Sequence, residues 1–310
     1  MNSRKPFRQL PFRALPETPR RAHDFLELPT ERVTVEVDGE RSRITHRVVG
    51  PASAPPLVLV HGLMTSGYSF RYVVRPLVEA GFRVLVPDLP GAGASDALAA
   101  PHSAPRLARA LGAYLRATGT WGERVVGNSM GGYLAMRLAL DEPAAMSRLV
   151  NVHSPVLPLP RLHALHFALG TGLARRVLGR VVALDPERWV HRNVHYRDET
   201  LKSREEARVY AEPLRTRAGR RAFASWLGDG LDPADLETFA RDVGRSSAGF
   251  PIPLQLVYAR TDPMVPPEMG EALHHLVPDA PMVWLEESSH FAHVDTPEAF
   301  LAAVLPFLQA

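Results

Sequence analysis

The feature that most constrains the fold is an alternation of short, wholly apolar runs with segments of helical length. Apolar runs at 57–60, 84–86 and 125–126 each stop at a glycine, proline or polar turn, as strands buried on both faces do. The helix-length segments that follow them lie at 68–80, 105–118 and 130–141. Strand and helix in alternation predict parallel strands joined by right-handed crossovers, and hence a doubly wound α/β sheet flanked by helices.

Other patterns precede this alternation and interrupt it before it resumes near the C-terminus. Two segments of alternating polarity around Asp38-Gly39 predict a β-hairpin at the start. After a strand at 148–152 the pattern becomes helical as far as about residue 250. The remaining strands and the closing helix are predicted at 254–258, 282–285 and 297–308. We therefore expect a mostly parallel, eight-stranded sheet domain, 31–155 and 249–310, split by a helical insertion, 156–248.

Composition narrows the possible classes of protein. The chain has 310 residues, 45% of them hydrophobic and 22% charged, which suits a globular protein with a sizeable core. It has no cysteine, which excludes disulfides, thiolate zinc sites and a cysteine nucleophile. A net charge of +3 is too balanced to predict a nucleic-acid partner. No segment resembles a secretory signal or a membrane span, so we expect a cytoplasmic protein without stable membrane insertion.

The excess of positive charge is concentrated at the N-terminus. The first 22 residues contain four prolines and a single acidic residue, Glu17. Their basic residues are Arg4, Lys5, Arg8, Arg13, Arg20 and Arg21. This composition predicts a solvated, basic, proline-rich arm over residues 1–30.

The pattern Gly-x-Ser-x-Gly, centred on Ser129, is the strongest sign of chemistry. A chain of this length has about a 10% chance of containing the pattern by accident, so its placement matters more than the string. It follows the strand at 123–126 and precedes a helix, where a sharp turn strains the serine and leaves no room for side chains two positions away. The helix N-terminus then favours developing negative charge. The alternative is a glycine-rich turn used only for packing.

With these motifs in place, residues 31–310 outside the insertion resemble the α/β-hydrolase superfamily. His61-Gly62 follows a strand as in the family's oxyanion loop, and the segment 88–95 matches the loop after the next strand, which is structural in the family. Segments 258–266 and 288–298 look like the family's acid and histidine loops. The family's order of serine, acid, histidine implies the remaining roles: Ser129 as nucleophile, Asp262 as orienting acid and His290 as general base.

Two positions depart from the family pattern. Ser289 stands where a glycine usually precedes the catalytic histidine, and His293 offers a second histidine, although it coincides with the family's supporting position. The competing acid site after the sixth strand, 151–154, contains no carboxylate. Asp262 and His290 are therefore the preferred partners of the serine.

The resemblance also implies a mechanism. His290 takes the hydroxyl proton, an acyl-enzyme forms, and the backbone N–H groups of Leu63 and Met130 stabilise the oxyanion. This predicts a carboxylic ester hydrolase whose partner is a small molecule with an ester-like carbonyl, with no cofactor and no metal. The segment 127–132 is also similar to the elbow of carbon-carbon bond hydrolases of aromatic ring-cleavage pathways, although 61–67 lacks their glycine-rich loop. A ligand-binding protein without activity is the alternative of another class.

The resemblance identifies the insertion, 156–248, as a cap that shapes the substrate pocket. A stripe of apolar residues at helical spacing predicts cap core rather than a substrate rail: Leu162, Leu165, Leu169, Leu173 and Val177. Three arginines are expected to face solvent, with an anionic substrate or a membrane surface as alternatives: Arg175, Arg176 and Arg180. His163 and His166 lie one turn apart, but the absence of nearby carboxylates argues against a metal site.

Overall fold

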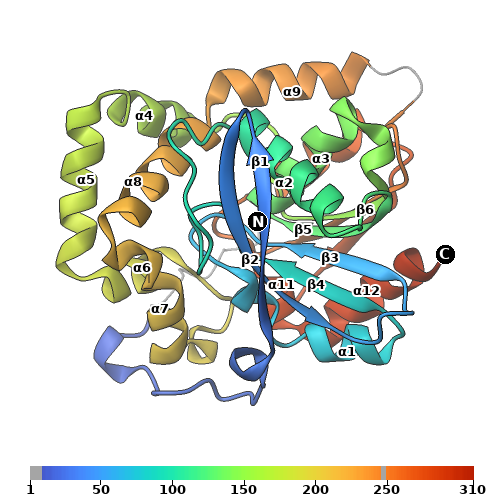
Figure 1. Cartoon of the computed structure of the whole chain (residues 1–310), viewed down its shortest axis with the longest axis horizontal. Helices are drawn as coiled ribbons and strands as arrows, with labels where there is room; N and C mark the ends of the chain where they lie inside the picture. Colours follow the sequence, from blue (N-terminus) through green and yellow to red (C-terminus); the bar gives the residue numbers. More distant parts are fainter. Residues whose placement is uncertain (1–8, 246–248) are drawn as a thin grey trace, which may run out of the picture.

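A computed structural model describes residues 9–245 and 249–310. Its sheet has eight strands in the order β1-β2-β4-β3-β5-β6-β7-β8 (Figure 1). The strands are β1 (Thr30–Val37), β2 (Glu40–Val49), β3 (Pro56–Val60), β4 (Arg83–Pro87), β5 (Glu123–Asn128), β6 (Met146–Val152), β7 (Leu254–Ala259) and β8 (Met282–Leu285). Among the strands of the described residues, only the β1–β2 and β2–β4 pairs are antiparallel. The predicted doubly wound, mostly parallel sheet is confirmed.

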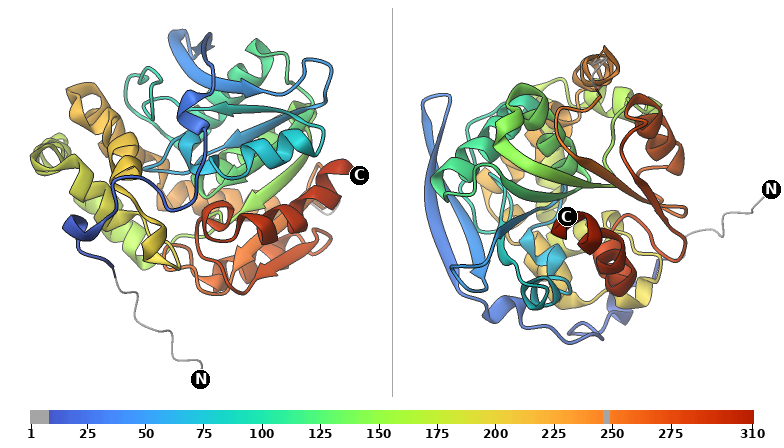
Figure 2. Two further views of the ribbon diagram at one scale, coloured as in Figure 1. Left: turned by 90° about the horizontal axis from the view of Figure 1, so that it is seen from below. Right: turned by 90° about the vertical axis from the view of Figure 1, so that its right-hand side faces the viewer.

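Helices cover both faces of this sheet (Figure 2). They are α1 (Val74–Glu79), α2 (Ala104–Ala117), α3 (Met130–Asp141), α10 (Pro267–Leu276), α11 (Ala292–Asp295) and α12 (Pro297–Gln309). Because successive side chains of a strand point to opposite faces, Val58 and Val60 enter one hydrophobic cluster while Leu57 and Leu59 enter the other. The wholly apolar runs of the sequence are thus explained by two cores, one on each side.

Helices fill the chain between β6 and β7. They are α4 (Pro160–Ala168), α5 (Gly172–Leu184), α6 (Pro186–Asn193), α7 (Arg204–Ala211), α8 (Arg217–Ser225) and α9 (Pro233–Arg245). Figure 1 shows α4 to α8 grouped on one side, whereas α9 lies over α3. The Tyr133 hydroxyl of α3 donates to Asp235 of α9 at 2.6 Å, and Phe239 packs edge-on against the Tyr133 ring. Helical periodicity alone did not separate α9, which joins the core, from the outer group. From here on the term insertion denotes this outer group, residues 160–230, a shorter span than the predicted 156–248.

The expectation of a solvated N-terminal arm is wrong for residues 9–28. Backbone N–H groups of Arg204 and Glu205 donate to carbonyls of the arm at 2.9 and 3.0 Å, and the arm runs along the insertion toward β1 (Figure 2, left). The expectation rests on the charged residues, and those that the structure describes do face solvent. Three buried apolar side chains nevertheless anchor the segment: Leu15, Phe25 and Leu28. The basic residues 4, 5 and 8 lie outside the described residues.

The predicted apolar stripe of the insertion is buried only in part. Leu162 and Leu169 are buried, as expected of a core, but Leu173 is 68% and Val177 49% exposed. The helix is interrupted between α4 and α5, around Gly170. A spacing counted across this interruption therefore did not describe a single helix face. No helix among the described residues is long and apolar enough to cross a bilayer.

Candidate active site

Ser129 occupies the sharp turn between β5 and α3. Its backbone angles, φ 54° and ψ −121°, lie outside the regions favoured by residues with a Cβ, a conformation that costs about 1–3 kcal/mol. A Cβ added to Gly127 would lie 2.5 Å from the Cα of Gly132, and one added to Gly131 would lie 2.3 Å from the carbonyl oxygen of Val60. The collisions predicted on both sides of the serine are therefore confirmed.

The neighbouring strand β6 holds this strained turn. The Ser129 N–H donates to the carbonyl of Val152 at 2.7 Å, and the hydroxyl of Ser154 donates to the Ser129 carbonyl at 2.8 Å. The side chain of Asn128 is fully buried, whereas Ser129 retains partial exposure. Both backbone groups of the serine are thus fixed by β6 and the residues that follow it.

The structure brings His290 and Asp262 together. Nδ1 of His290 lies 2.7 Å from Oδ2 of Asp262, and the two side chains are only 2% and 0% exposed. The other carboxylate oxygen accepts the N–H groups of Met264 and Val265 at 2.7 and 2.9 Å. Burial acts to raise the pKa of Asp262, but the charge and hydrogen bond of His290 outweigh it and hold that pKa below its ordinary value. An ionised Asp262 then keeps the Nδ1 proton on His290.

A further bond connects this pair to the serine turn. The side-chain amide of Asn128, the residue before Ser129, donates to the backbone carbonyl of His290 at 3.0 Å. The three residues proposed from the sequence therefore come from loops that meet at the carboxyl ends of β5, β7 and β8. Parallel strands end at one edge of a sheet, which is where ligands bind in this class of fold.

The serine in place of the usual glycine before His290 has a local partner. Both the N–H, at 2.9 Å, and the hydroxyl of Ser289 donate to one carboxylate oxygen of Asp295, and the N–H of Arg197 donates to the other at 3.0 Å. Burial raises the pKa of Asp295 to about 7. Sequence reasoning missed Asp295 as a support of this loop, although it lies within the motif that identified His290.

Two further histidines lie close to His290. His293 stacks on Phe70 with ring centroids 4.5 Å apart, and its ring nitrogens have no hydrogen-bond partner among the described residues. Burial lowers the pKa of His293 well below its ordinary value, so it is a neutral packing residue, and His290 is the histidine that contacts Asp262. His153, which the sequence did not single out, has φ 53° and its ring lies 5.7 Å from that of His290. Burial lowers its pKa to about 4.

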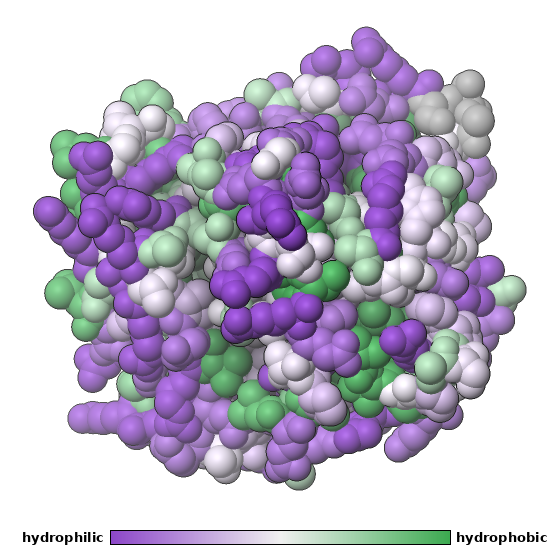
Figure 3. Space-filling model, viewed as in Figure 1, coloured by the Kyte–Doolittle hydropathy of each residue, from purple (hydrophilic) through white to green (hydrophobic). Residues whose placement is uncertain are grey.

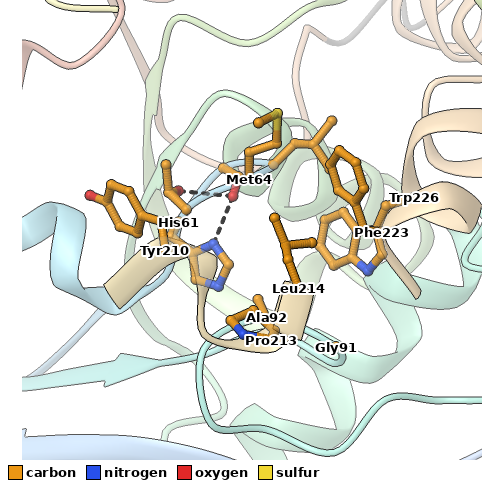
Figure 4. A pocket seen from close by; sticks show the side chains of 12 residues that line it. His61, Met64, Gly91, Ala92, Tyr210, Pro213, Leu214, Phe223 and Trp226 are labelled. Carbon is orange, nitrogen blue, oxygen red and sulfur yellow. Dashed lines mark hydrogen bonds between the residues drawn. The ribbon is translucent and has the colours of Figure 1, made fainter. Parts of the chain in front are cut away.

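The loop after β3 lies directly over the serine. A Cβ added to Gly62 would be 3.0 Å from the Cβ of Ser129. The Gly62 carbonyl accepts the Thr65 hydroxyl at 3.0 Å and Nδ1–H of His61 at 2.7 Å (Figure 4). His61 carries that proton because its Nε2 accepts the N–H of Leu89. In a trans peptide C=O and N–H point in opposite directions, so these bonds turn the N–H of Leu63 away from Thr65.

Met130 provides the second predicted donor. It is the first residue of α3, so its N–H has no acceptor within the helix and lies at the positive end of the helix dipole. Leu63 lines the cavity between the oxyanion loop and the insertion, whereas Ser129 and Met130 are not among the residues around that cavity. The structure thus gives both predicted donors a backbone setting that suits an oxyanion hole.

A small cavity separates the oxyanion loop from the insertion. Its volume is about 30 Å³, room for roughly two waters. The residues around it come from both parts of the chain: His61, Gly62, Leu63, Met64, Thr65, Gly91, Ala92, Tyr210, Pro213, Leu214, Phe223 and Trp226. None is an arginine, lysine or carboxylate. The indole N–H of Trp226 donates to the Pro90 carbonyl at 3.0 Å and joins the insertion to the core.

Comparisons with known proteins agree with this architecture. Residues 55–297 match the family model described as alpha/beta hydrolase fold. A magnesium-chelatase 30 kDa subunit of Rhodobacter capsulatus is 40% identical over 106 residues, but the match spans only 34% of this chain and 36% of that protein. A 2-hydroxy-6-oxononadienedioate/2-hydroxy-6-oxononatrienedioate hydrolase of Burkholderia vietnamiensis is 28% identical over 293 residues, 89% of this chain and 94% of that protein.

Solved structures show the same fold. A thermophilic esterase from Thermogutta terrifontis superposes with a TM-score of 0.71 at 20% identity, over 90% of this chain and 98% of that one. At this identity the likeness concerns the fold alone. Since the family model covers well over half of the sequence and the strand order agrees with it, the chain belongs to the alpha/beta hydrolase fold family.

Proposed function

We propose that this hydrolase cleaves carboxylic esters through an acyl-enzyme on Ser129. The observation that carries the proposal is the fully buried His290–Asp262 pair, tied through Asn128 to a serine on a strained turn. A serine hydroxyl is a weak nucleophile near neutral pH, and an imidazole held by a carboxylate is the base that activates it.

In this mechanism His290 accepts the proton of Ser129 during attack and returns it to the leaving alcohol. Asp262 holds the tautomer and stabilises the imidazolium. Negative charge on the substrate oxygen meets the N–H groups of Leu63 and Met130, each worth about 3 kcal/mol in a site of this kind. His290 then takes a proton from water, which attacks the acyl-enzyme, and the acid leaves as the proton returns to Ser129.

The cavity supports an uncharged, apolar substrate. Its walls include Leu214, Phe223 and Trp226 from the insertion, and none of its lining residues is an arginine or lysine that would pair with a carboxylate. Its volume of about 30 Å³ is far below the roughly 300–1,000 Å³ of typical ligand pockets. We propose that the insertion acts as a cap and moves away from the oxyanion loop when substrate binds.

Carbon-carbon bond hydrolysis is the second candidate. It is favoured by the 28% identity to the nonadienedioate hydrolase over nearly the whole length of both chains. The name of that relative denotes a substrate with two carboxylates, for which the apolar cavity described here has no counter-charge. The lining residues therefore rank simple esters first.

A substrate panel tests the proposal. Wild-type protein is expected to hydrolyse p-nitrophenyl esters of short and medium acyl chains faster than it bleaches a vinylogous diketo acid. It is also expected to be labelled by a fluorophosphonate, whereas Ser129→Ala is not. Equal ester turnover by wild type and His290→Ala would refute the triad. Absence of labelling in either form would favour a binding protein without activity.

A further inference from the structure

Helix α5 of the insertion has two apolar faces, and the residues that the structure describes cover only one of them. Val182 is fully buried, and α5 packs against α8. On the opposite side Leu173, Val177, Val181 and Leu184 are 68%, 49%, 48% and 85% exposed. At 100° per residue these four positions fall within an arc of about 80°. An apolar stripe in water is not required to pack the helix, because the other face already does so.

The end of α4, just before α5 in the chain, exposes a further apolar side chain, and this segment carries positive charge. Phe167 is 88% exposed, and residues 160–184 contain no aspartate or glutamate. Arg161, Arg176 and Arg180 are exposed, and they form no ion pair with any residue that the structure describes. In the space-filling view, hydrophobic patches lie among hydrophilic ones along the edge that holds α5 (Figure 3). We call Leu173, Arg176, Val177, Arg180, Val181 and Leu184 the basic apolar face.

Arg175 behaves differently from its neighbours. Both of its terminal nitrogens donate to the carboxylate of Asp229 at 2.7 and 2.8 Å, and this bidentate bond fixes α5 to the π-helical turn Trp226–Gly230. The helix is therefore held in one orientation, with its basic apolar face directed outward.

We propose that the basic apolar face docks on the surface of an anionic lipid bilayer. A helix with exposed apolar side chains and unpaired arginines lies in the plane of the interface, where the acyl boundary accepts the apolar groups and the headgroups pair with the cations. Charge decides against a second copy of the chain as the occupant, because a two-fold interface would bring identical unpaired arginines together. The proposal concerns peripheral binding and adds to the proposed esterase activity without depending on it.

Docking would also orient the site. Helix α8, which α5 covers, carries Phe223 of the cavity wall. A bilayer bound to α5 would therefore lie beside the part of the insertion that shapes the cavity, which would give apolar substrates a route from lipid.

Sedimentation of full-length protein with vesicles tests the proposal. Wild type is expected to bind vesicles of phosphatidylcholine with 30% phosphatidylglycerol at low salt, to release in high salt as screening grows, and to bind pure phosphatidylcholine weakly. Each arginine near such a surface contributes about a fivefold change in affinity, so Arg176→Gln/Arg180→Gln should bind about 25-fold more weakly. Leu173→Ser/Leu184→Ser should lose at least about tenfold.

The matched control is Arg32→Gln/Arg41→Gln, which removes two exposed arginines of the β1–β2 hairpin and should bind like wild type. Thermal unfolding checks that all variants fold, as substitutions at exposed positions should allow. Equal binding by every variant, or no binding to anionic vesicles at low salt, overturns the proposal. A dimer that forms with rising protein concentration, without vesicle binding, also overturns the proposal if Leu173→Ser/Leu184→Ser abolishes it. That result would assign the face to a second copy of the chain.

Discussion

The loops of the sheet core and the outer helices of the insertion differ in how strictly packing and hydrogen bonds restrict which residues can stand there. A Cβ added to Gly131 in the core would lie 2.3 Å from a backbone oxygen, whereas one added to Gly172 at the start of α5 meets nothing within 4 Å. Asp262 accepts three hydrogen bonds, while Arg176 and Arg180 pair with no described residue. The proposed chemistry lies where geometry permits few substitutions, and the surface that is free to vary lies outside it.

The largest effect is expected from removing the charge behind the histidine. Asp262→Asn keeps the shape of the site but no longer fixes the Nδ1 proton of His290, and in a relay of this kind the loss in kcat is about 10⁴-fold. Kinetics on a p-nitrophenyl ester would measure it. Arg176→Gln in the insertion is the control and should keep wild-type kcat. A loss below tenfold in Asp262→Asn would show that the relay is not the source of activity.

The second effect concerns the joint between the two regions. Arg71 of the core, whose side chain is fully buried, binds Glu206 of α7 at 2.7 Å, and Glu206 also accepts the hydroxyl of Tyr196. Arg71→Met leaves the carboxyl buried without its cation, and we expect the free energy of unfolding to fall by about 3–5 kcal/mol. Denaturant titration measures it.

The double variant Arg71→Met/Glu206→Leu sharpens this test. It removes both charges, so its loss should be smaller than that of Arg71→Met alone. If the double variant instead loses the sum of the two single variants, the ion pair does not couple the insertion to the core.

Strand-helix alternation predicted the sheet, and the placement of Gly-x-Ser-x-Gly between a strand and a helix predicted the serine turn. The resemblance to the hydrolase family proposed the acid and the histidine as its partners. Sequence reasoning did not identify Thr65, His153 or Asp295, whose positions depend on contacts between loops that are distant in sequence. It also joined α4 and α5 into one stripe, because helical spacing does not register the break at Gly170. The periodicity of α9 predicted a helix correctly, but which surface covers a helix is a tertiary property.

The third prediction concerns acid stability at the same joint. His102 precedes α2, its N–H donates to the hydroxyl of Ser225 at 2.8 Å, and its ring nitrogens have no hydrogen-bond partner among the described residues. Burial lowers the pKa of His102 to about 4, whereas the unfolded chain has a pKa near 6.5. Between these values the unfolded state binds the extra proton, so stability falls as pH falls, by about 1.4 kcal/mol per pH unit.

His102→Leu should therefore flatten the pH dependence. From pH 6.5 to 5 the wild type should lose about 1.6 kcal/mol more than the variant, a difference measured by urea unfolding at each pH. His274→Leu, at a partly exposed position on α10, is the control for replacing a histidine by leucine elsewhere in the core. Parallel slopes in wild type and His102→Leu would show that the folded protein protonates His102 as readily as the unfolded chain does, which contradicts the prediction.

The smallest effect tests how finely the core is determined. The Thr65 hydroxyl is one of two donors to the Gly62 carbonyl, and through that peptide it aims the N–H of Leu63. Thr65→Val keeps the shape and removes one hydrogen bond worth about 1 kcal/mol, so kcat should fall about fivefold while KM stays constant, because an oxyanion donor acts mainly in the transition state. Thr65→Ser, which keeps the hydroxyl, should recover most of the rate. A rise in KM at constant kcat would instead show that Thr65 only lines the cavity. The oxyanion loop would then tolerate substitution as the outer helices of the insertion do, unlike the other loops of the core.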